Sequence, residues 1–308
     1  MSGGRLHWVT GKGGVGKSTV AAAIALGLAR SGQRVLAIEL GPPAGLHRIL
    51  QLPPTPSGAT ALAPSGVMWA SFDGEAALAE YLRRRLRLGP ALELVLGHPL
   101  YRAFVGAAPG LRELMAVGKV RDELRAKERW RRRWDAIVID AGASGRALEH
   151  LRMPAVAART FRSGLVHREA SRIEALLSDP RRCALHVVAL AEPMPVVEAQ
   201  EIVERARELR LPIGRLILNA CREAAPVGTE AALARLTGGG GEAESRGLAR
   251  RELARVARQR LGWLSIQERS IAQLEGALGL EALRLPRLAP PLGERALATL
   301  ADHFEAEP

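Results

Sequence analysis

Cysteine is scarce in this sequence. Cys183 and Cys221 are the only two among 308 residues, and they lie far apart. Their spacing matches neither a metal-binding pattern nor a disulfide framework, which indicates a protein of a reducing compartment. We therefore expect each thiol to serve as a small buried apolar group.

Long apolar runs are missing as well. The apolar residues after Arg5 are interrupted by glycines from Gly11 onward, so no export signal is indicated. No stretch approaches the roughly 20 apolar residues that a membrane-spanning helix needs. These absences predict a cytoplasmic protein with no integral membrane segment.

Lysine is rare although the formal net charge is +12, because only four of the 44 basic residues are lysine. A nucleic-acid-binding face would gather its basic residues into one patch. Here the arginines are spread over nearly every expected helix, and the densest runs fall on or at the ends of helices, at Arg83 to Arg85 and Arg131 to Arg133. We therefore expect no nucleic-acid partner.

Aromatic residues make up only 4% of the chain. Trp8 and Trp134 stand beside expected strands, which favours packing in a core over stacking on bases. The seven histidines show no metal-ligand spacing, so we expect them to be structural.

The chain alternates between expected strands and helices. A strand at Leu6 to Thr10, a glycine-rich loop, a helix at Ser18 to Arg30 and a strand at Arg34 to Leu40 form a βαβ unit. Further strands are expected at Val67 to Phe72, Trp134 to Asp140, Ala184 to Leu190, Arg215 to Ala220 and Ala282 to Leu285. This order predicts an α/β fold with a doubly wound, mostly parallel sheet of about seven strands flanked by helices.

We expect one domain over residues 1–308, with a helical subregion at about 76–133. The segment Leu52 to Ser65 carries four prolines and is expected to be a loop. We expect Gly238 to Gly241 to be a flexible connection. Neither segment needs to be a domain boundary.

The loop from Gly11 to Ser18 satisfies the phosphate-binding pattern G-x-x-x-x-G-K-S/T between a strand and a helix. Its backbone N–H groups and the helix N-terminus would surround phosphates. Lys17 would reach the β- and γ-phosphates, and the Ser18 hydroxyl would ligate Mg²⁺. The pattern predicts ATP and Mg²⁺ as ligands, with nucleotide contacts from Gly11, Lys12, Gly13, Gly14, Val15, Gly16, Lys17, Ser18 and Thr19.

A carboxylate near the metal is expected at the end of a hydrophobic strand. The run from Trp134 to Asp140 ends in one, so Asp140 is the candidate metal and catalytic carboxylate beside Ser18. The alternative is an aspartate that merely begins the next loop.

Lys12 sets this loop apart, because the segment from Lys12 to Ser18 resembles the deviant Walker A loop of the dimeric, SIMIBI-type P-loop ATPases. In that class the extra lysine reaches the nucleotide of the partner subunit. The resemblance therefore implies a dimer in which Lys12 has a catalytic role across the interface.

The segment from Asp140 to Pro154 resembles the second switch of the arsenite-pump and tail-anchored-protein-targeting ATPase family, D-T-A-P-T-G-H-x-L-x-x-L-x-x-P. Five positions match, and three differ at Ala141, Ala143 and Arg146. Other family-like segments are Pro109 to Glu113, Glu192-Pro193 through Glu198, Leu218-Asn219 and Leu285 to Leu288. Together they point to the shorter bacterial branch of the family, whose members often occur as paired paralogues.

The same resemblance implies an adenine site. In the family, the residue at the position of Asn219 recognises adenine, and the loop that includes Pro286 and Arg287 packs over the base. An amide that both donates and accepts suits this role. The alternative for Asn219 is a turn residue at the end of a strand.

The first switch departs from the family, whose D-P-A segment carries an aspartate that positions the attacking water. Gly41 occupies that place here, and glycine cannot orient water. Glu39 is the nearest candidate to take over the catalytic role. An equally good reading makes Glu39 a structural carboxylate that contacts a backbone N–H group or an arginine.

Family clients are not indicated, because the chain lacks a C-x-x-C pair and a methionine-rich helix. The leading hypothesis is a Mg-ATP-dependent dimeric switch ATPase, a homodimer or a heterodimer with a paralogue, that acts on an unknown client. The alternative is a nucleotide-binding but catalytically weak subunit. A partition-type ATPase on DNA or membrane ranks third, because the stretch from Glu294 to Pro308 is not basic.

Overall fold

The computed structural model describes residues 5–41, 43, 45–85, 94, 96, 98–99, 110–142, 144–238, 244–289 and 293–305. Its main sheet has eight strands in the order β10-β9-β8-β1-β7-β2-β4-β3, and all neighbouring pairs are parallel except β3 with β4. The strands are β1 Leu6–Gly11, β2 Val35–Leu40, β3 Thr60–Leu62, β4 Met68–Phe72, β7 Ala136–Asp140, β8 Cys183–Leu190, β9 Ile213–Cys221 and β10 Ala282–Pro286. The predicted α/β fold is confirmed, with one strand more than expected.

The additional strand β3 lies inside the proline-containing segment that was expected to be a loop. It has three residues and pairs antiparallel with β4 at the sheet edge, where Thr60 faces Ala70. A three-residue edge strand carries too little alternation to be recognised from sequence.

A second correction concerns Arg131 to Arg133, which were expected on or at the end of a helix. The helix α6 ends at Arg125, and the chain then forms a small antiparallel hairpin from β5 Lys127–Glu128 and β6 Arg131–Arg132. Arg129 and Trp130 make its turn with φ of 45° and 73°. Positive φ is uncommon for such residues, so the turn is not visible in their identity.

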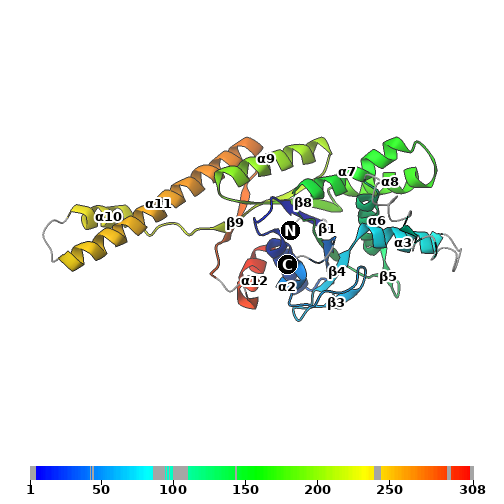
Figure 1. The fold of residues 1–308 in the computed structure, drawn as a ribbon, viewed down its shortest axis with the longest axis horizontal. Helices are drawn as coiled ribbons and strands as arrows, with labels where there is room; N and C mark the ends of the chain where they lie inside the picture. The colour runs from blue at the N-terminus through cyan, green and yellow to red at the C-terminus, as the bar shows by residue number, and fades with distance from the viewer. Residues whose placement is uncertain are drawn as a thin grey trace.

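Helices cover both faces of the sheet (Figure 1). Strand side chains alternate between the faces: Leu6 and Trp8 pack on one side, and Val9 packs on the other. The Val9 side is covered by α1 Lys17–Arg30, α2 Leu46–Ile49, α12 Glu294–Ala301 and the short helix η1 Asp302–Phe304. The Trp8 side is covered by α6 Leu111–Arg125, α7 Ser144–Thr160, α8 Gly164–Leu177, α9 Pro193–Glu208 and the C-terminal part of α11 Glu244–Leu278.

The expected helical subregion is present in part. The helix α3 Gly74–Arg85 packs beside α6, where Lys119 forms an ion pair of 2.8 Å with Glu80. Arg121 of α6 in turn pairs with Glu169 of α8 at 2.5 Å. Residues 86–93, 95, 97 and 100–109 lie outside the described part of the chain. The prediction of a single domain stays a prediction.

The helix α10 Thr229–Gly238 and the N-terminal part of α11 form an arm that projects away from the sheet (Figure 1). The expected flexible connection falls between them, with Gly238 at the end of α10 and residues 239–241 outside the described set. The inner part of α11 returns to the body and ends near β10. This return brings residues of α11 close to the strand ends that form the candidate site.

Both cysteines are buried and free, as expected, and burial raises the pKa of Cys183 to about 12 and that of Cys221 to about 11. Trp8 and Trp134 are likewise buried, which confirms their packing role. Within the described ranges, every helix is too short or too polar to cross a bilayer.

Candidate functional site

The glycine-rich loop joins β1 to α1 at the carboxyl edge of the sheet. Gly11 lies opposite Val188 of β8, and a Cβ atom at Gly11 would stand 2.1 Å from the Val188 carbonyl oxygen. Gly16 has φ of 89°, and a Cβ there would stand 2.2 Å from Asn219 Nδ2. Glycine is therefore required at both ends of the loop, for space at the first and for space and backbone conformation at the second.

The N-terminus of α1 is open to an anion. Gly16 occupies the N-cap position, no side chain caps the helix, and its first turn contains no acidic residue. Lys17 Nζ donates to the Lys12 carbonyl oxygen at 2.7 Å, and burial lowers the pKa of Lys17 while nearby Asp140 opposes that shift. Backbone donors and an ammonium group thus converge where a phosphate would bind.

Ser18 and Asp140 form an oxygen pair beside the loop. Ser18 Oγ donates to Asp140 Oδ2 at 2.5 Å, because parallel pairing places Asp140 next to Val9 of β1. Asp140 is only 4% exposed, and this burial raises the pKa of its carboxyl, with a further contribution from Glu39. Among the described residues no group of three His, Cys, Asp or Glu side chains could hold a metal, so a cation here would draw on this pair.

Lys12 forms an ion pair within its own chain. Its Nζ atom contacts Glu198 Oε1 of α9, and the Lys12 side chain is 48% exposed. Glu198 Oε2 is buried and has no hydrogen-bond partner among the described residues. The lysine that was expected to reach a partner subunit is thus held by an α9 carboxylate in the single chain.

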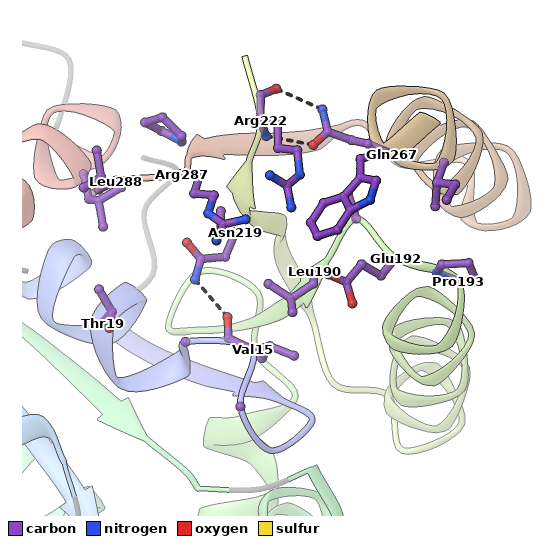
Figure 2. A pocket seen from close by; sticks show the side chains of 18 residues that line it. Val15, Thr19, Leu190, Glu192, Pro193, Asn219, Arg222, Gln267, Arg287 and Leu288 are labelled. Carbon is purple, nitrogen blue, oxygen red and sulfur yellow. Dashed lines mark hydrogen bonds between the residues drawn. The ribbon is translucent and has the colours of Figure 1, made fainter. Parts of the chain in front are cut away.

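Several predicted nucleotide residues line one cavity of about 640 Å³. Asn219, at the end of β9, donates from Nδ2 to the Val15 carbonyl oxygen at 2.9 Å, which joins the β9 end to the phosphate loop (Figure 2). The other predicted residues in this lining are Gly14, Gly16, Thr19, Pro286 and Arg287. Predicted residues from three separate segments of the chain therefore meet at one site.

Other lining residues were not predicted, and three of them contact one another: Arg222, Trp263 and Gln267. Gln267 Oε1 accepts from the Arg222 backbone N–H at 2.8 Å, and Gln267 Nε2 donates to the Arg222 carbonyl at 3.0 Å. The Arg222 guanidinium lies over the Trp263 ring, 3.9 Å from its centroid. No local motif marks these residues, because only the return of α11 to the body brings Trp263 and Gln267 to the strand ends.

Glu39 is buried at the end of β2 and contacts the start of α2. Its Oε1 accepts from the Gly45 N–H at 2.6 Å and from the Leu46 N–H at 3.2 Å, and its Oε2 lies 3.4 Å from His47 Nδ1. These contacts are those of the structural reading, in which Glu39 holds the segment after the first switch. Its role in positioning water stays a prediction.

Gly41 has φ of 95°, and open space lies where its Cβ would be. The backbone at the position of the family's aspartate thus adopts a conformation that favours glycine. Its neighbours Pro42 and Ala44 lie outside the described residues, as do Pro109 and Ala143 of the other two switch-like segments.

Comparison with known proteins agrees with this geometry. The profile of the anion-transporting ATPase family matches residues 5–170, which contain the phosphate loop, Glu39 and Asp140. ATPase BagA of Mycobacterium tuberculosis is 37% identical over 224 residues, covering 71% of this chain and 66% of BagA. Rv2184c of the same organism is 28% identical over 256 residues, covering 70% of this chain and 58% of Rv2184c.

The match thus spans a little under two thirds of BagA. The profile covers more than half of the chain and includes β1, α1 and β7, which carry the phosphate loop and Asp140. The chain belongs to the anion-transporting ATPase family.

Proposed function

We propose that this chain binds and hydrolyses Mg-ATP and that the nucleotide drives a cycle of subunit association. One observation carries the proposal: the phosphate loop, with Lys17 and the Ser18–Asp140 pair beside it, adjoins the same cavity that Asn219 lines. Phosphate, metal and base contacts are then available along one continuous surface.

The phosphates would lie at the N-terminus of α1. Lys17 would exchange its present contact with the Lys12 carbonyl for the β- and γ-phosphates, which offer it full negative charge. The base would lie toward Asn219, whose Nδ2 is bonded to Val15 and whose amide oxygen could accept from an exocyclic amino group. Pro286 and Arg287 of the same cavity would cover the base.

Ser18 and Asp140 suit Mg²⁺ on the chemistry of their donors. A hydroxyl and a buried carboxylate are held 2.5 Å apart next to Lys17, and Mg²⁺ prefers oxygen ligands and is usually shared between one or two protein groups and phosphates. When bound, the ion would neutralise charge on the phosphate oxygens. Ser18 and Asp140 would hold it through their oxygen atoms.

Lys12 is the residue that would link the two subunits of a dimer. The residue is half exposed at the rim of the loop and pairs with Glu198 in its own chain. Association with a second copy or with a paralogue would replace this contact by the partner's nucleotide. The helical subregion at about 76–133 would then change the surface that it offers to a client, and hydrolysis would reset the cycle.

The second candidate is a subunit that binds ATP but turns it over weakly, and Gly41 favours it. Glycine supplies no group to orient water, and Glu39 is engaged with backbone N–H groups at the start of α2. Such a subunit would need an active paralogue as partner. Both candidates share the same nucleotide site and differ only in hydrolysis.

Turnover of the purified chain alone separates the two. We expect Mg-dependent phosphate release that Lys17→Ala abolishes and that Lys127→Ala, a substitution in the exposed β5–β6 hairpin, leaves unchanged. ATP binding by calorimetry without turnover would favour the weak subunit. Absence of ATP binding in the unmodified chain would contradict both candidates.

A further inference from the structure

The cavity beside the phosphate loop contains a planar cationic stack. Arg222, directly after β9, places its guanidinium 3.9 Å from the ring centroid of Trp263, which lies midway along α11. Both residues line the cavity that also contains Asn219, Pro286 and Arg287. Figure 2 shows the Arg222 side chain pointing into this cavity, with Asn219 between it and Val15.

Hydrogen bonds to the backbone hold the Arg222 end of the stack in place. Gln267 is buried and bonds both the N–H and the carbonyl of Arg222, at 2.8 Å and 3.0 Å. The Arg287 N–H, in turn, donates to the carbonyl of Cys221, the residue before Arg222, at 2.8 Å. A long arginine side chain usually loses much rotamer freedom when it binds a ligand, and a fixed backbone with a ring behind the guanidinium reduces that loss.

Among the described residues, no carboxylate forms an ion pair with the Arg222 guanidinium. Burial lowers the pKa of Arg222, and the positive charges of Arg287 and Arg260 lower it further, against the opposing effect of Glu192. The Trp263 ring covers one face of the guanidinium, and a second π system would be attracted to the other face in the same way.

Arg222 could meet either end of a nucleotide, and the geometry distinguishes them. The phosphate end is set by Lys17 and by the Ser18–Asp140 pair at the start of α1. Asn219 stands between Val15 of that loop and Arg222 in the view of Figure 2. Asn219 bonds the phosphate loop at Val15, whereas Arg222 is held by Trp263 and Gln267 of α11, so the base is the part of the nucleotide that Arg222 would meet.

We propose that Arg222, backed by Trp263, is the stacking platform for the nucleotide base. One face of the guanidinium rests on the indole, and the other receives the base whose edge Asn219 contacts. Arg222 is then a binding residue, and Trp263 and Gln267 are positioning residues that act through it. The inference rests on the proposed ATP site and adds to it three residues outside the family-like segments.

Calorimetry with two ligands tests this role. In Arg222→Lys, which keeps the charge but loses the plane, we expect ATP to bind about tenfold more weakly, as loss of one stacking contact predicts. Inorganic tripolyphosphate should bind as to the unmodified chain. Arg260→Lys is the matched control, because Arg260 lines a neighbouring cavity, which Arg222 and Trp263 also border, and is absent from the lining of the cavity with Asn219.

Tryptophan emission gives a second readout that a purely structural role would not move. ATP should change the emission of the unmodified chain and of Trp130→Phe, whose tryptophan is fully exposed in the β5–β6 turn. The change should be lost in Trp263→Phe, which keeps an aromatic ring behind Arg222. Circular dichroism and thermal unfolding identify any variant that fails to fold.

The outcomes separate the inference from the proposed function. Unaltered ATP affinity in Arg222→Lys, or an equal loss for ATP and tripolyphosphate, would overturn the stacking role while the ATP site stands. If the unmodified chain binds tripolyphosphate but no ATP, the base site is absent, and the proposed function fails together with the inference. If it binds neither ligand, the proposed function fails and the inference fails with it.

Discussion

Ser18 Oγ donates a 2.5 Å hydrogen bond to the carboxylate of Asp140, across 122 positions of sequence. The contact joins the first turn of α1 to the end of β7, and it exists because β7 lies directly beside β1 in the sheet. Any cation held by one of these oxygens therefore meets the other.

Asp140→Asn should remove the metal-dependent part of nucleotide binding. An amide of the same shape is a weaker metal ligand than a carboxylate, so we expect ATP affinity in Mg²⁺ to fall by about 10- to 100-fold. Affinity in EDTA should be unchanged, as measured by calorimetry. Asp73→Asn is the matched control, since Asp73 accepts the Glu75 and Ala76 N–H groups at the start of α3 and asparagine caps equally well. Equal losses with and without Mg²⁺ would contradict the assignment of Asp140.

Lys12→Ala should bind ATP but fail to associate. The Lys12 ammonium contacts Glu198 and lies outside the cavity lining, so the chain's own nucleotide contacts remain. Size-exclusion chromatography with light scattering should show an ATP-induced dimer for the unmodified chain and for Lys127→Ala, and a monomer for Lys12→Ala. If the chain pairs only with a paralogue, the same comparison applies to the mixture. Normal association of Lys12→Ala would exclude the bridging role.

Glu198→Gln should favour association at lower ATP. The substitution removes the charge that holds Lys12 in its own chain. An ion pair of this exposure contributes about 1 kcal/mol at most, so the ATP concentration for half-maximal dimer should fall by no more than about fivefold. Glu204→Gln, an exposed change on the same helix, should have no effect. A rise in the required ATP would show instead that Glu198 assists association.

Gly41→Asp should not by itself restore a fast enzyme. Outside its chain neighbours, no described atom lies within 4 Å of a Cβ at this position, but φ of 95° is a conformation that residues other than glycine rarely adopt. We expect Gly41→Asp and Gly41→Ala each to lower the free energy of unfolding by about 1 kcal/mol, measured with urea. Faster ATP turnover in Gly41→Asp than in Gly41→Ala would show that the new carboxylate orients water. Unchanged stability in both variants would contradict the backbone argument.

Stability should fall on acidification because His186 is buried without charge. Its Nδ1 accepts the Arg215 backbone N–H at 3.1 Å, its Nε2 lies 3.1 Å from His7 Nδ1, and burial holds the pKa of His186 well below 6.5. Below pH 6.5 the His186 imidazole binds a proton in the unfolded chain but not in the folded chain. The contribution of uncharged His186 to the free energy of unfolding is therefore complete above pH 6.5. Below that pH it falls by up to about 1.4 kcal/mol per pH unit for one proton.

Urea unfolding at pH 7.5 and pH 5.5 measures this effect. The loss of stability between the two should be smaller in His186→Leu than in the unmodified chain, whereas the exposed His303→Gln should behave as the unmodified chain does. An equal loss in His186→Leu would assign the acid sensitivity to other groups.

Much of the core was readable from local pattern. The buried strands β1, β2, β7, β8, β9 and β10 are short apolar runs, and each was expected within two residues of its observed bounds. The loop from Gly11 to Ser18 could be predicted because close contacts and positive φ require glycine at its positions. The edge strand β3 and the β5–β6 hairpin were not predicted, because strands of two or three residues show no periodicity.

Sequence alone determined that a phosphate loop exists, that Asp140 ends a buried strand and that Gly41 stands where the family carries an aspartate. Tertiary structure decided the partners of those residues: Glu198 for Lys12, backbone N–H groups for Glu39, and the stack of Arg222 on Trp263. The physical reason is the distance along the sequence over which each feature is determined. Glycine conformation and strand burial depend on near neighbours, whereas the return of α11 to the strand ends depends on packing between helices far apart in the chain.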